Sequence, residues 1–314
     1  MKKIIKNLTT ILITIVMMAT FTACTSNNTD GSSGAKNETA QTGYPYTFTD
    51  SMGNEVVIES EPKRIISVAP SITEIVYALE KGDNLVGRTD YCDYPEEAKT
   101  VESIGSLTDP NVEKIVELKP DVVIASTHFK EDVAQKLKDL GIKIVVINDS
   151  TNIDGAYESI NKLGEILNAK DKAEEVVNSN KKKIEEIKEK VKEAEVPKAY
   201  YVVGFGKNGD FTATGDTFVA EMLGLAGGNN IAQDATGWAY SLESLIENDP
   251  EYIIISKNYG MKDEFMATEG YKELSAVKNN KVFEIDDNLV NRQGPRIAEG
   301  VEALAKILHP NLFE

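Results

Sequence analysis

Aromatic side chains recur in the predicted loops of this sequence, at Tyr91, Tyr94, Phe129, Phe205, Trp238, Tyr240 and Tyr259. Any one of them could simply fill the core. Gathered at strand-to-helix loops of two facing halves, however, aromatic rings suit a large, flat, apolar ligand. Basic residues could supply counter-charges for carboxylates, phosphate or an anionic metal chelate, or could merely be solvated; these are Arg88, Lys207, Lys257, Arg292 and Arg296.

No catalytic set is visible in the sequence. It contains neither G-x-S-x-G nor H-E-x-x-H, and its only histidines are His128 and His309. Most hydrolase mechanisms would therefore lack a base, and a zinc site built from several histidines cannot be assembled. We expect a protein that is not an enzyme, with no catalytic cofactor and no resident metal.

A glycine-rich motif, Gly204-Phe205-Gly206-Lys207-Asn208-Gly209, follows a predicted strand. Binding of a dinucleotide would require these glycines to open a helix whose N-terminus faces the pyrophosphate. Residues 210–215 intervene before any helical pattern begins. We therefore interpret the motif as a flexible loop at the edge of a cleft.

Short apolar runs alternate with helical patterns in two stretches of the chain. Strands are expected at 65–68, 85–88, 121–125 and 144–147, and again at 200–203, 252–255 and 282–285. Helices are expected to begin near Ser71, Val112, Val133, Asp216 or Thr217, Leu242 and Ile297. Ser71 should cap the first helix and Gly82 should end it. This alternation predicts two parallel α/β sheets, each covered on both faces.

The stretch between these halves has a helical pattern. Apolar residues spaced by three or four run from Ile160 to Val191, and no Gly or Pro interrupts 171–195. A coiled-coil dimer would need a longer seam. The predicted fold class is therefore α/β, with two parallel-sheet lobes bridged by one long α-helix and a ligand cleft between the lobes. The expected boundaries are 46–153 for the N-terminal lobe, 154–196 for the bridging helix region and 197–314 for the C-terminal lobe.

Two segments of the predicted lobes share their spacing. Residues 112–121 (VEKIVELKPD) and 242–251 (LESLIENDPE) each place a glutamate, Glu113 or Glu243, near a helix start and a proline before a strand. Either glutamate alone could be an ordinary acid favoured by the helix dipole. Equivalent placement in both halves favours a common role, since two carboxylates on separate lobes could steer a basic partner.

The N-terminus carries a targeting pattern. Three lysines precede an apolar segment at 11–20, and Phe21-Thr22-Ala23-Cys24 resembles the lipobox of bacterial lipoproteins. Residues 1–23 would then be a cleaved signal peptide, and the polar residues 24–45 a flexible tether. We expect an extracytoplasmic protein held at the cell membrane by acyl chains on Cys24. An ordinary signal peptide with an incidental cysteine is the alternative.

Charge and cysteine content exclude other roles. The formal net charge is −17, and loss of Lys2, Lys3 and Lys6 with the signal lowers it to −20. Such a surface repels nucleic acid, so we expect no nucleic-acid partner. Cys92 is the only cysteine besides Cys24. We expect it to be a small, partly buried residue rather than a nucleophile.

Several motifs together resemble those of one family. They are 64–74 (RIISVAPSITE), 91–95 (YCDYP), 112–123 (VEKIVELKPDVV), 227–232 (GGNNIA) and 291–296 (NRQGPR). From about Arg64 to Leu308 the chain is similar to the substrate-binding proteins of ABC importers for cobalamin, ferric siderophores and haem. The resemblance implies two α/β lobes joined by one rigid helix.

Within that family the sequence is most similar to cobalamin-binding members. The resemblance implies that Glu113 and Glu243 pair with arginines of the permease. It also implies ligand contacts from the motif of Tyr91, from Trp238 and from the loop before the last helix. The candidate ligand-binding residues are therefore Tyr91, Trp238, Asp286, Asp287, Asn288, Leu289, Val290 and Arg292.

We therefore expect a monomeric, lipid-anchored receptor that captures cobalamin or a related metal chelate. It would deliver this ligand to a membrane permease dimer with its ATPase. Uptake of a ferric siderophore or of haem is the alternative within the binding class. Haem would require an axial ligand such as Tyr91 or His128, whereas an anionic siderophore would require the basic residues. The absence of a catalytic set disfavours an exported enzyme, and the two-lobe pattern with aromatic loops disfavours a purely structural surface lipoprotein.

Overall fold

The computed structural model describes residues 43–207 and 209–313. The predicted signal peptide, Cys24 and nearly all of the predicted tether lie outside these residues. The described residues form one compact unit. Among the described helices, none has the length and the apolar character needed to cross a membrane.

The N-terminal lobe is built on a four-stranded parallel sheet in the order β4-β3-β5-β6. Its strands are β3 (Ile65–Ser67), β4 (Leu85–Arg88), β5 (Val122–Ala125) and β6 (Ile144–Val146). Its helices are α1 (Pro70–Ala78), α2 (Val112–Glu117) and α3 (Glu131–Asp139), with 3₁₀ turns η1 (Gly82–Asn84) and η2 (Glu96–Thr100). The four strands predicted from apolar runs in this half are confirmed.

An antiparallel hairpin precedes this sheet, formed by β1 (Tyr46–Thr49) and β2 (Glu55–Ile58). Asp50 fixes its turn, because its carboxylate accepts hydrogen bonds from the backbone of Met52 and Asn54. Gly53 takes a φ of 80°, which glycine adopts at little cost. The sequence does not predict this hairpin.

The C-terminal lobe contains a five-stranded mixed sheet in the order β11-β10-β7-β8, with β9 also paired to β7. Its strands are β7 (Lys198–Gly204), β8 (Phe211–Thr212), β9 (Asn229–Asn230), β10 (Tyr252–Ser256) and β11 (Val282–Ile285). Its helices are α6 (Phe218–Leu225), α7 (Leu242–Asn248), α8 (Lys262–Ala267), α9 (Ser275–Lys278), α10 (Asn288–Asn291) and α11 (Ile297–Leu308), with 3₁₀ turns η3 (Tyr271–Glu273) and η4 (Pro310–Leu312). Its three longer strands are those predicted, and only β8 runs antiparallel to its neighbour.

The glycine-rich motif lies in the hairpin between β7 and β8. Gly206 and Gly209 have φ values of 90° and 99°, and the Gly209 N–H donates to the Gly206 carbonyl. An antiparallel strand, rather than a helix, follows the motif. The interpretation as a loop therefore agrees with the structure.

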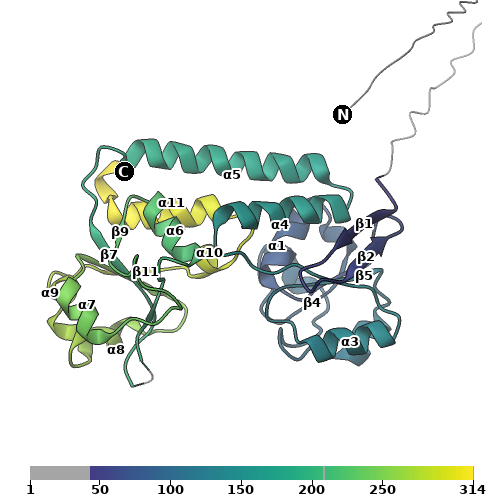
Figure 1. Ribbon diagram of the computed structural model, residues 1–314, viewed down its shortest axis with the longest axis horizontal. Coiled ribbons are helices and arrows are strands. Elements are labelled where there is room, and N and C mark those ends of the chain that lie inside the picture. Colours follow the sequence, from purple (N-terminus) through teal and green to yellow (C-terminus); the bar gives the residue numbers. More distant parts are fainter. Residues whose placement is uncertain (1–42, 208, 314) are drawn as a thin grey trace, which may run out of the picture. The chain divides into compact units, whose positions relative to one another are not determined.

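The bridging region contains two helices, where the sequence predicted one. These are α4 (Ile153–Ile166) and α5 (Lys170–Val191), separated at Asn168, whose φ of 54° lies in the left-handed region. Asn tolerates this conformation better than most residues, so it ends α4. Gly164 then lets α5 approach closely, since a Cβ there would lie 2.5 Å from the Cβ of Ala173. The long bridge is α5 alone, and it crosses elements of both lobes (Figure 1).

The predicted start and the predicted end of α1 are also wrong. Pro70, rather than a residue after Ser71, is the first helical residue, and no side chain caps this helix. Proline suits that position because the first helical N–H groups have no intrahelical partner. The helix ends at Ala78, with Glu80 at a φ of 59°, and Gly82 begins the 3₁₀ turn η1.

One hydrophobic core is shared by both lobes, and each lobe has a second core of its own. Alternate residues of each central strand point to opposite faces, so Ile65 and Tyr201 enter the shared core while Ile66 and Tyr200 enter separate cores of their own lobes. Helix α5 covers the shared core and packs against α4, α11, α1 and α6. Each sheet is therefore buried on both faces, as its continuous apolar strands predict.

Asn180 is the polar exception on the buried side of α5. Its side-chain amide donates to the Pro295 carbonyl at 2.8 Å and accepts from the Ala298 N–H at 2.9 Å. The Ala298 N–H belongs to the first turn of α11, where backbone donors lack intrahelical partners. Asn180 therefore fixes the turn that leads into α11 to the bridging helix.

We predict that Asn180→Ala lowers the free energy of unfolding by about 2 kcal/mol, because it removes the partner of the buried Ala298 N–H and that of the partly buried Pro295 carbonyl. Urea denaturation followed by circular dichroism measures the change. Asn178→Ala is the matched control, since Asn178 is an exposed asparagine of the same helix. Equal stability of the two variants would contradict the role of Asn180.

Candidate ligand-binding site

The structure divides the candidate aromatic residues into two groups. Phe129 is buried, and Phe205 and Tyr240 pack with the aromatic core of the C-terminal lobe. The others are exposed: Tyr91 by 66%, Tyr94 by 44%, Trp238 by 41% and Tyr259 by 71%. These four rings are the aromatic surface that remains available for a ligand.

The segment that carries Tyr91 follows β4 and is anchored at its middle. Cys92 is fully buried, and its Sγ lies 3.2 Å from the Thr89 Oγ1. The Cys92 N–H donates to the Thr89 carbonyl, which closes a tight turn. Burial raises the pKa of the Cys92 thiol. The thiol therefore serves packing, as predicted, and the buried cysteine directs Tyr91 on its N-terminal side to the surface.

Trp238 lies in an unusual backbone conformation. Its φ of 70° is in the left-handed region, which bulky residues rarely adopt. Three hydrogen bonds maintain it: the Trp238 N–H donates to the Thr214 Oγ1, its carbonyl accepts from the Thr212 N–H, and the preceding Gly237 N–H donates to Asp216. Strain of this kind persists only where the surrounding structure enforces it, and it accompanies functional positions.

The segment from Asp286 to Val290 follows β11 at the carboxyl edge of its sheet, and its last three residues, predicted as a loop, form the first part of the short helix α10. Asp286 pairs with Lys257, which follows the neighbouring strand β10, at 3.1 Å. Asp287 is buried and accepts a hydrogen bond from Asn258. Asn288 and Leu289 are half-buried. Val290 is fully buried in the shared core, so its side chain cannot contact a ligand, contrary to the prediction.

The pKa of Asp286 lies below its ordinary value. Burial alone would raise this pKa, but the bonds from Lys257 and from the Asn288 N–H together outweigh that effect. The carboxylate is therefore held in its charged form, paired with a lysine that is half exposed.

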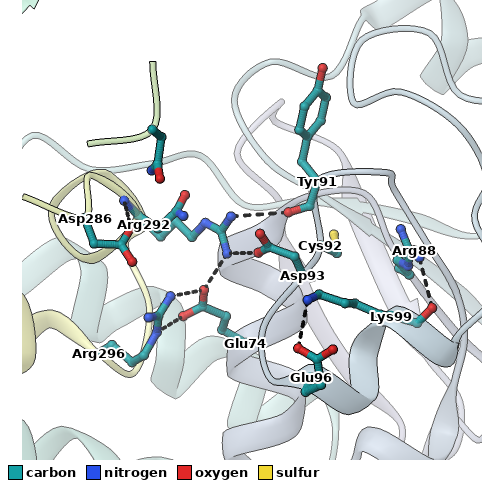
Figure 2. Close-up of polar contacts among 12 residues, drawn as sticks. Glu74, Arg88, Tyr91, Cys92, Asp93, Glu96, Lys99, Asp286, Arg292 and Arg296 are labelled. Carbon is teal, nitrogen blue, oxygen red and sulfur yellow. Dashed lines mark hydrogen bonds and ion pairs between the residues drawn. The ribbon is translucent and has the colours of Figure 1, made fainter. Parts of the chain in front are cut away.

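Arg292 and Arg296 connect this part of the C-terminal lobe to the N-terminal lobe (Figure 2). The Arg292 Nη1 lies 3.0 Å from Glu74 and 2.7 Å from Asp93. The Arg296 guanidinium donates twice to Glu74, at 2.8 and 2.6 Å, and lies 3.9 Å from the centre of the Tyr94 ring. We call Glu74, Asp93, Arg292 and Arg296 the inter-lobe ion cluster. The sequence did not indicate that Glu74 takes part.

The other basic residues predicted as counter-charges for a ligand differ in the partners that they have within the protein. Arg88 donates to the carbonyls of Thr89, Asp90 and Lys99, and Lys257 pairs with Asp286. Lys207 is exposed. Four of the five predicted counter-charges therefore already have partners within the protein.

The two histidines differ in their surroundings. His128 is exposed in the loop after β5, whereas His309 is buried with its Nε2 3.2 Å from the Gly227 carbonyl. His309 therefore serves the fold. In the described part of the chain, no group of three or more His, Cys, Asp or Glu residues is arranged to hold a metal ion.

Glu113 and Glu243 occupy equivalent positions in two nearly identical local structures. Each lies exposed in the first turn of its helix, after a side-chain cap by Asn111 in α2 and by Ser241 in α7. Both helices bury one apolar residue and end at a left-handed residue before a proline: Ile115, Lys119 and Pro120 in α2, and Leu245, Asp249 and Pro250 in α7. Neither glutamate forms an ion pair within the described residues.

Comparison with known proteins identifies close relatives. A family model described as periplasmic binding protein matches residues 65–289. YvrC of Bacillus subtilis, named an uncharacterized ABC transporter substrate-binding lipoprotein, is 38% identical over 86% of this chain and 88% of its own. A vitamin B12-binding protein of Vibrio parahaemolyticus is 30% identical over 79% of this chain and 90% of its own. A solved Staphylococcus epidermidis structure, described as a possible iron-binding (periplasmic solute-binding) protein, matches with a TM-score of 0.71 and 30% identity over 80% of this chain and 100% of that chain.

We predict that Lys257→Gln raises the pKa of Asp286, because the variant removes the positive charge that favours the carboxylate. A folded-state pKa below the ordinary value stabilises the protein above about pH 4, and this contribution is lost as the pH falls further. The variant should therefore lose less stability between about pH 4 and pH 2 than the wild type. Carboxyl NMR titration measures the shift. Lys262→Gln removes an equal charge elsewhere in the lobe, and an identical Asp286 titration in both variants would contradict the pairing.

Proposed function

Because the chain belongs to the periplasmic binding protein family, we propose that it is the substrate-binding lipoprotein of an ABC importer and that its cargo is cobalamin or a related corrinoid. Members of this family bind solutes and catalyse no reaction. The observation that carries the cargo assignment is the 30% identity to a vitamin B12-binding protein over 90% of that protein's length.

The exposed aromatic residues support a broad, largely apolar ligand. Tyr91 belongs to the N-terminal lobe and Trp238 to the C-terminal lobe, and both rings retain a large exposed surface. Aromatic side chains contribute large apolar contact areas with few rotatable bonds. We propose that these two rings and the Asp286–Leu289 segment contact the corrinoid in a cleft between the lobes.

Iron uptake is the second candidate. It rests on the Staphylococcus epidermidis structure, whose sequence is 30% identical to this chain. Tyr91 and His128 are both exposed and chemically able to ligate the iron of haem. An anionic ferric siderophore would instead need free positive charge. Among the predicted basic residues, Lys207 and Lys257 are exposed, and Lys257 is paired with Asp286.

We propose that the protein acts at the outer face of the cell membrane, anchored through Cys24. Its similarity to a relative named a lipoprotein supports this location. Two or more acyl chains on that cysteine would hold the protein stably without a transmembrane helix. The tether of 24–45 would then let a monomeric receptor reach its permease dimer while remaining at high local concentration.

Glu113 and Glu243 are the proposed contacts with that permease. Both carboxylates are exposed, and each is displayed by the same capped helix start in its own lobe. Exposed charges chiefly provide specificity and a faster association with an oppositely charged partner. Two such groups on separate lobes would let arginines of the permease engage both lobes at once.

We predict that the protein, produced from Ser26 onward, binds cyanocobalamin and quenches the fluorescence of Trp238, its only tryptophan. Tyr91→Ala should weaken this binding by about tenfold, because it removes an aromatic contact. Titrations with haem and with several ferric siderophores, followed by absorbance, complete the comparison.

Val196→Ala is the control for Tyr91→Ala, since it shortens another exposed apolar side chain beyond the end of α5. Its affinity for cyanocobalamin should equal that of the wild type. Tight binding to haem or a siderophore alone would overturn the corrinoid assignment. Failure to bind any of these ligands would overturn the importer function.

We predict that Glu113→Gln combined with Glu243→Gln abolishes cobalamin uptake by cells while leaving ligand affinity unchanged. The two substitutions remove the charges that would pair with the permease and keep the size of the side chains. Uptake of radiolabelled cobalamin and fluorescence titration of the purified variant measure the two properties.

Glu117→Gln combined with Glu247→Gln is the matched control. These glutamates are exposed on the same two helices, four residues further along, and the variant has the same net charge. It should transport cobalamin normally. Equal uptake by both double variants would show that the helix-start positions have no special role in docking.

A further inference from the structure

A buried carboxylate lies at the junction of the two lobes. The Glu74 side chain of α1 is 1% exposed, and it accepts hydrogen bonds from Arg292 and Arg296 of the C-terminal lobe. A buried carboxylate is costly unless it is paired and hydrogen-bonded. Three bonds from two guanidinium groups satisfy it (Figure 2). Glu74 and Arg296 thereby fix the place of the Arg292 guanidinium.

From that place Arg292 reaches the segment that carries Tyr91. Its Nη1 donates to Asp93 at 2.7 Å, and its Nη2 donates to the Tyr91 carbonyl at 3.3 Å. These bonds flank the buried Cys92. The Tyr91 ring points away from the guanidinium (Figure 2). Arg292 thus contacts the backbone of this segment and leaves the ring free.

The inter-lobe ion cluster balances its own charges. Two guanidinium groups face the carboxylates of Glu74 and Asp93, and Arg296 also lies against the Tyr94 ring. Arg292 is only 12% exposed as a side chain. A cation engaged in this way has little attraction left for an anionic group on a ligand.

We propose that Arg292 is a positioning residue, which ties the Tyr91–Asp93 segment of the N-terminal lobe to the end of α10 in the C-terminal lobe, rather than a counter-charge for the ligand. The nature of the ligand rests on the proposed function. The link between the lobes does not, because it is made in the protein without ligand. This positioning role takes the place of the direct ligand contact that the sequence predicted for Arg292.

Hydrogen exchange of the ligand-free protein tests the link. In Arg292→Gln, the hydrogen-bonded amides of the 90–93 segment, those of Asp90 and Cys92, should exchange about tenfold faster or more, the ratio expected from loss of a hydrogen bond to a charged group. Gln293→Met is the control: Gln293 makes two 2.6 Å bonds with the backbone of Ser150, so its loss should affect residues near Ser150 and leave 90–93 unchanged.

Asp93→Asn provides a second variant, which leaves Glu74 paired with both arginines. It should accelerate exchange of 90–93 in the same direction as Arg292→Gln, by a smaller factor. If both variants leave this segment protected as in the wild type, Arg292 does not position it and the proposal is wrong.

Ligand charge distinguishes positioning from direct contact. Cyanocobalamin and its monocarboxylic acid differ by one negative charge at a peripheral side chain. Arg292→Gln should weaken both by the same factor, about tenfold, and should add little to the loss already caused by Tyr91→Ala. A larger loss for the acid, or losses that multiply in the double variant, would identify Arg292 as a ligand contact. If the wild type binds neither compound, the corrinoid assignment fails while the exchange experiment still decides the role of Arg292.

Discussion

The structure depends on the hydrophobic core that continues beneath both lobes. Ile160 and Leu163 of α4, Ile184 and Ile187 of α5, and Leu304 of α11 belong to one buried cluster. Each such side chain contributes about 1.5–3 kcal/mol when it leaves water. Separating the lobes would expose many of them at once. Because α5 is packed along its length, the shared core holds the two lobes together. The inter-lobe ion cluster adds to a contact that this apolar packing already maintains.

The elements that the sequence predicted are those with a clear hydrophobic pattern, either an unbroken apolar run or a helical period. Buried parallel strands such as Tyr252–Ser256 stand out as unbroken apolar runs, and the 3.6-residue period located α11 from end to end. The elements that it missed depend on tertiary contacts or single residues. Two-residue strands β8 and β9 exist only because β7 offers them backbone partners. The break at Asn168 interrupts no apolar pattern, so periodicity alone joined α4 to α5.

Part of the candidate site was also predictable from local patterns in the sequence. The Tyr91 and Trp238 rings were singled out by residue type and loop position, and the repeated spacing around Glu113 and Glu243 corresponds to a repeated local structure. The partner of Arg292 was not predictable. Glu74 lies 218 residues away in the sequence, inside a helix of the other lobe. Likewise, Val290 was placed among ligand contacts by its neighbours in the chain, whereas packing turns it into the core.

The buried carboxylate of Glu74 and the exposed carboxylates of Glu113 and Glu243, the proposed permease contacts, differ in their response to ionic strength. At about 0.15 M salt the screening length is about 8 Å, and exposed charges such as Glu113 and Glu243 lose much of their long-range attraction. Glu74 is shielded from dissolved ions by the protein around it. Rising salt would therefore slow the encounter with a basic partner long before it loosened the lobes from each other. A receptor built this way can leave its partner without changing its own conformation.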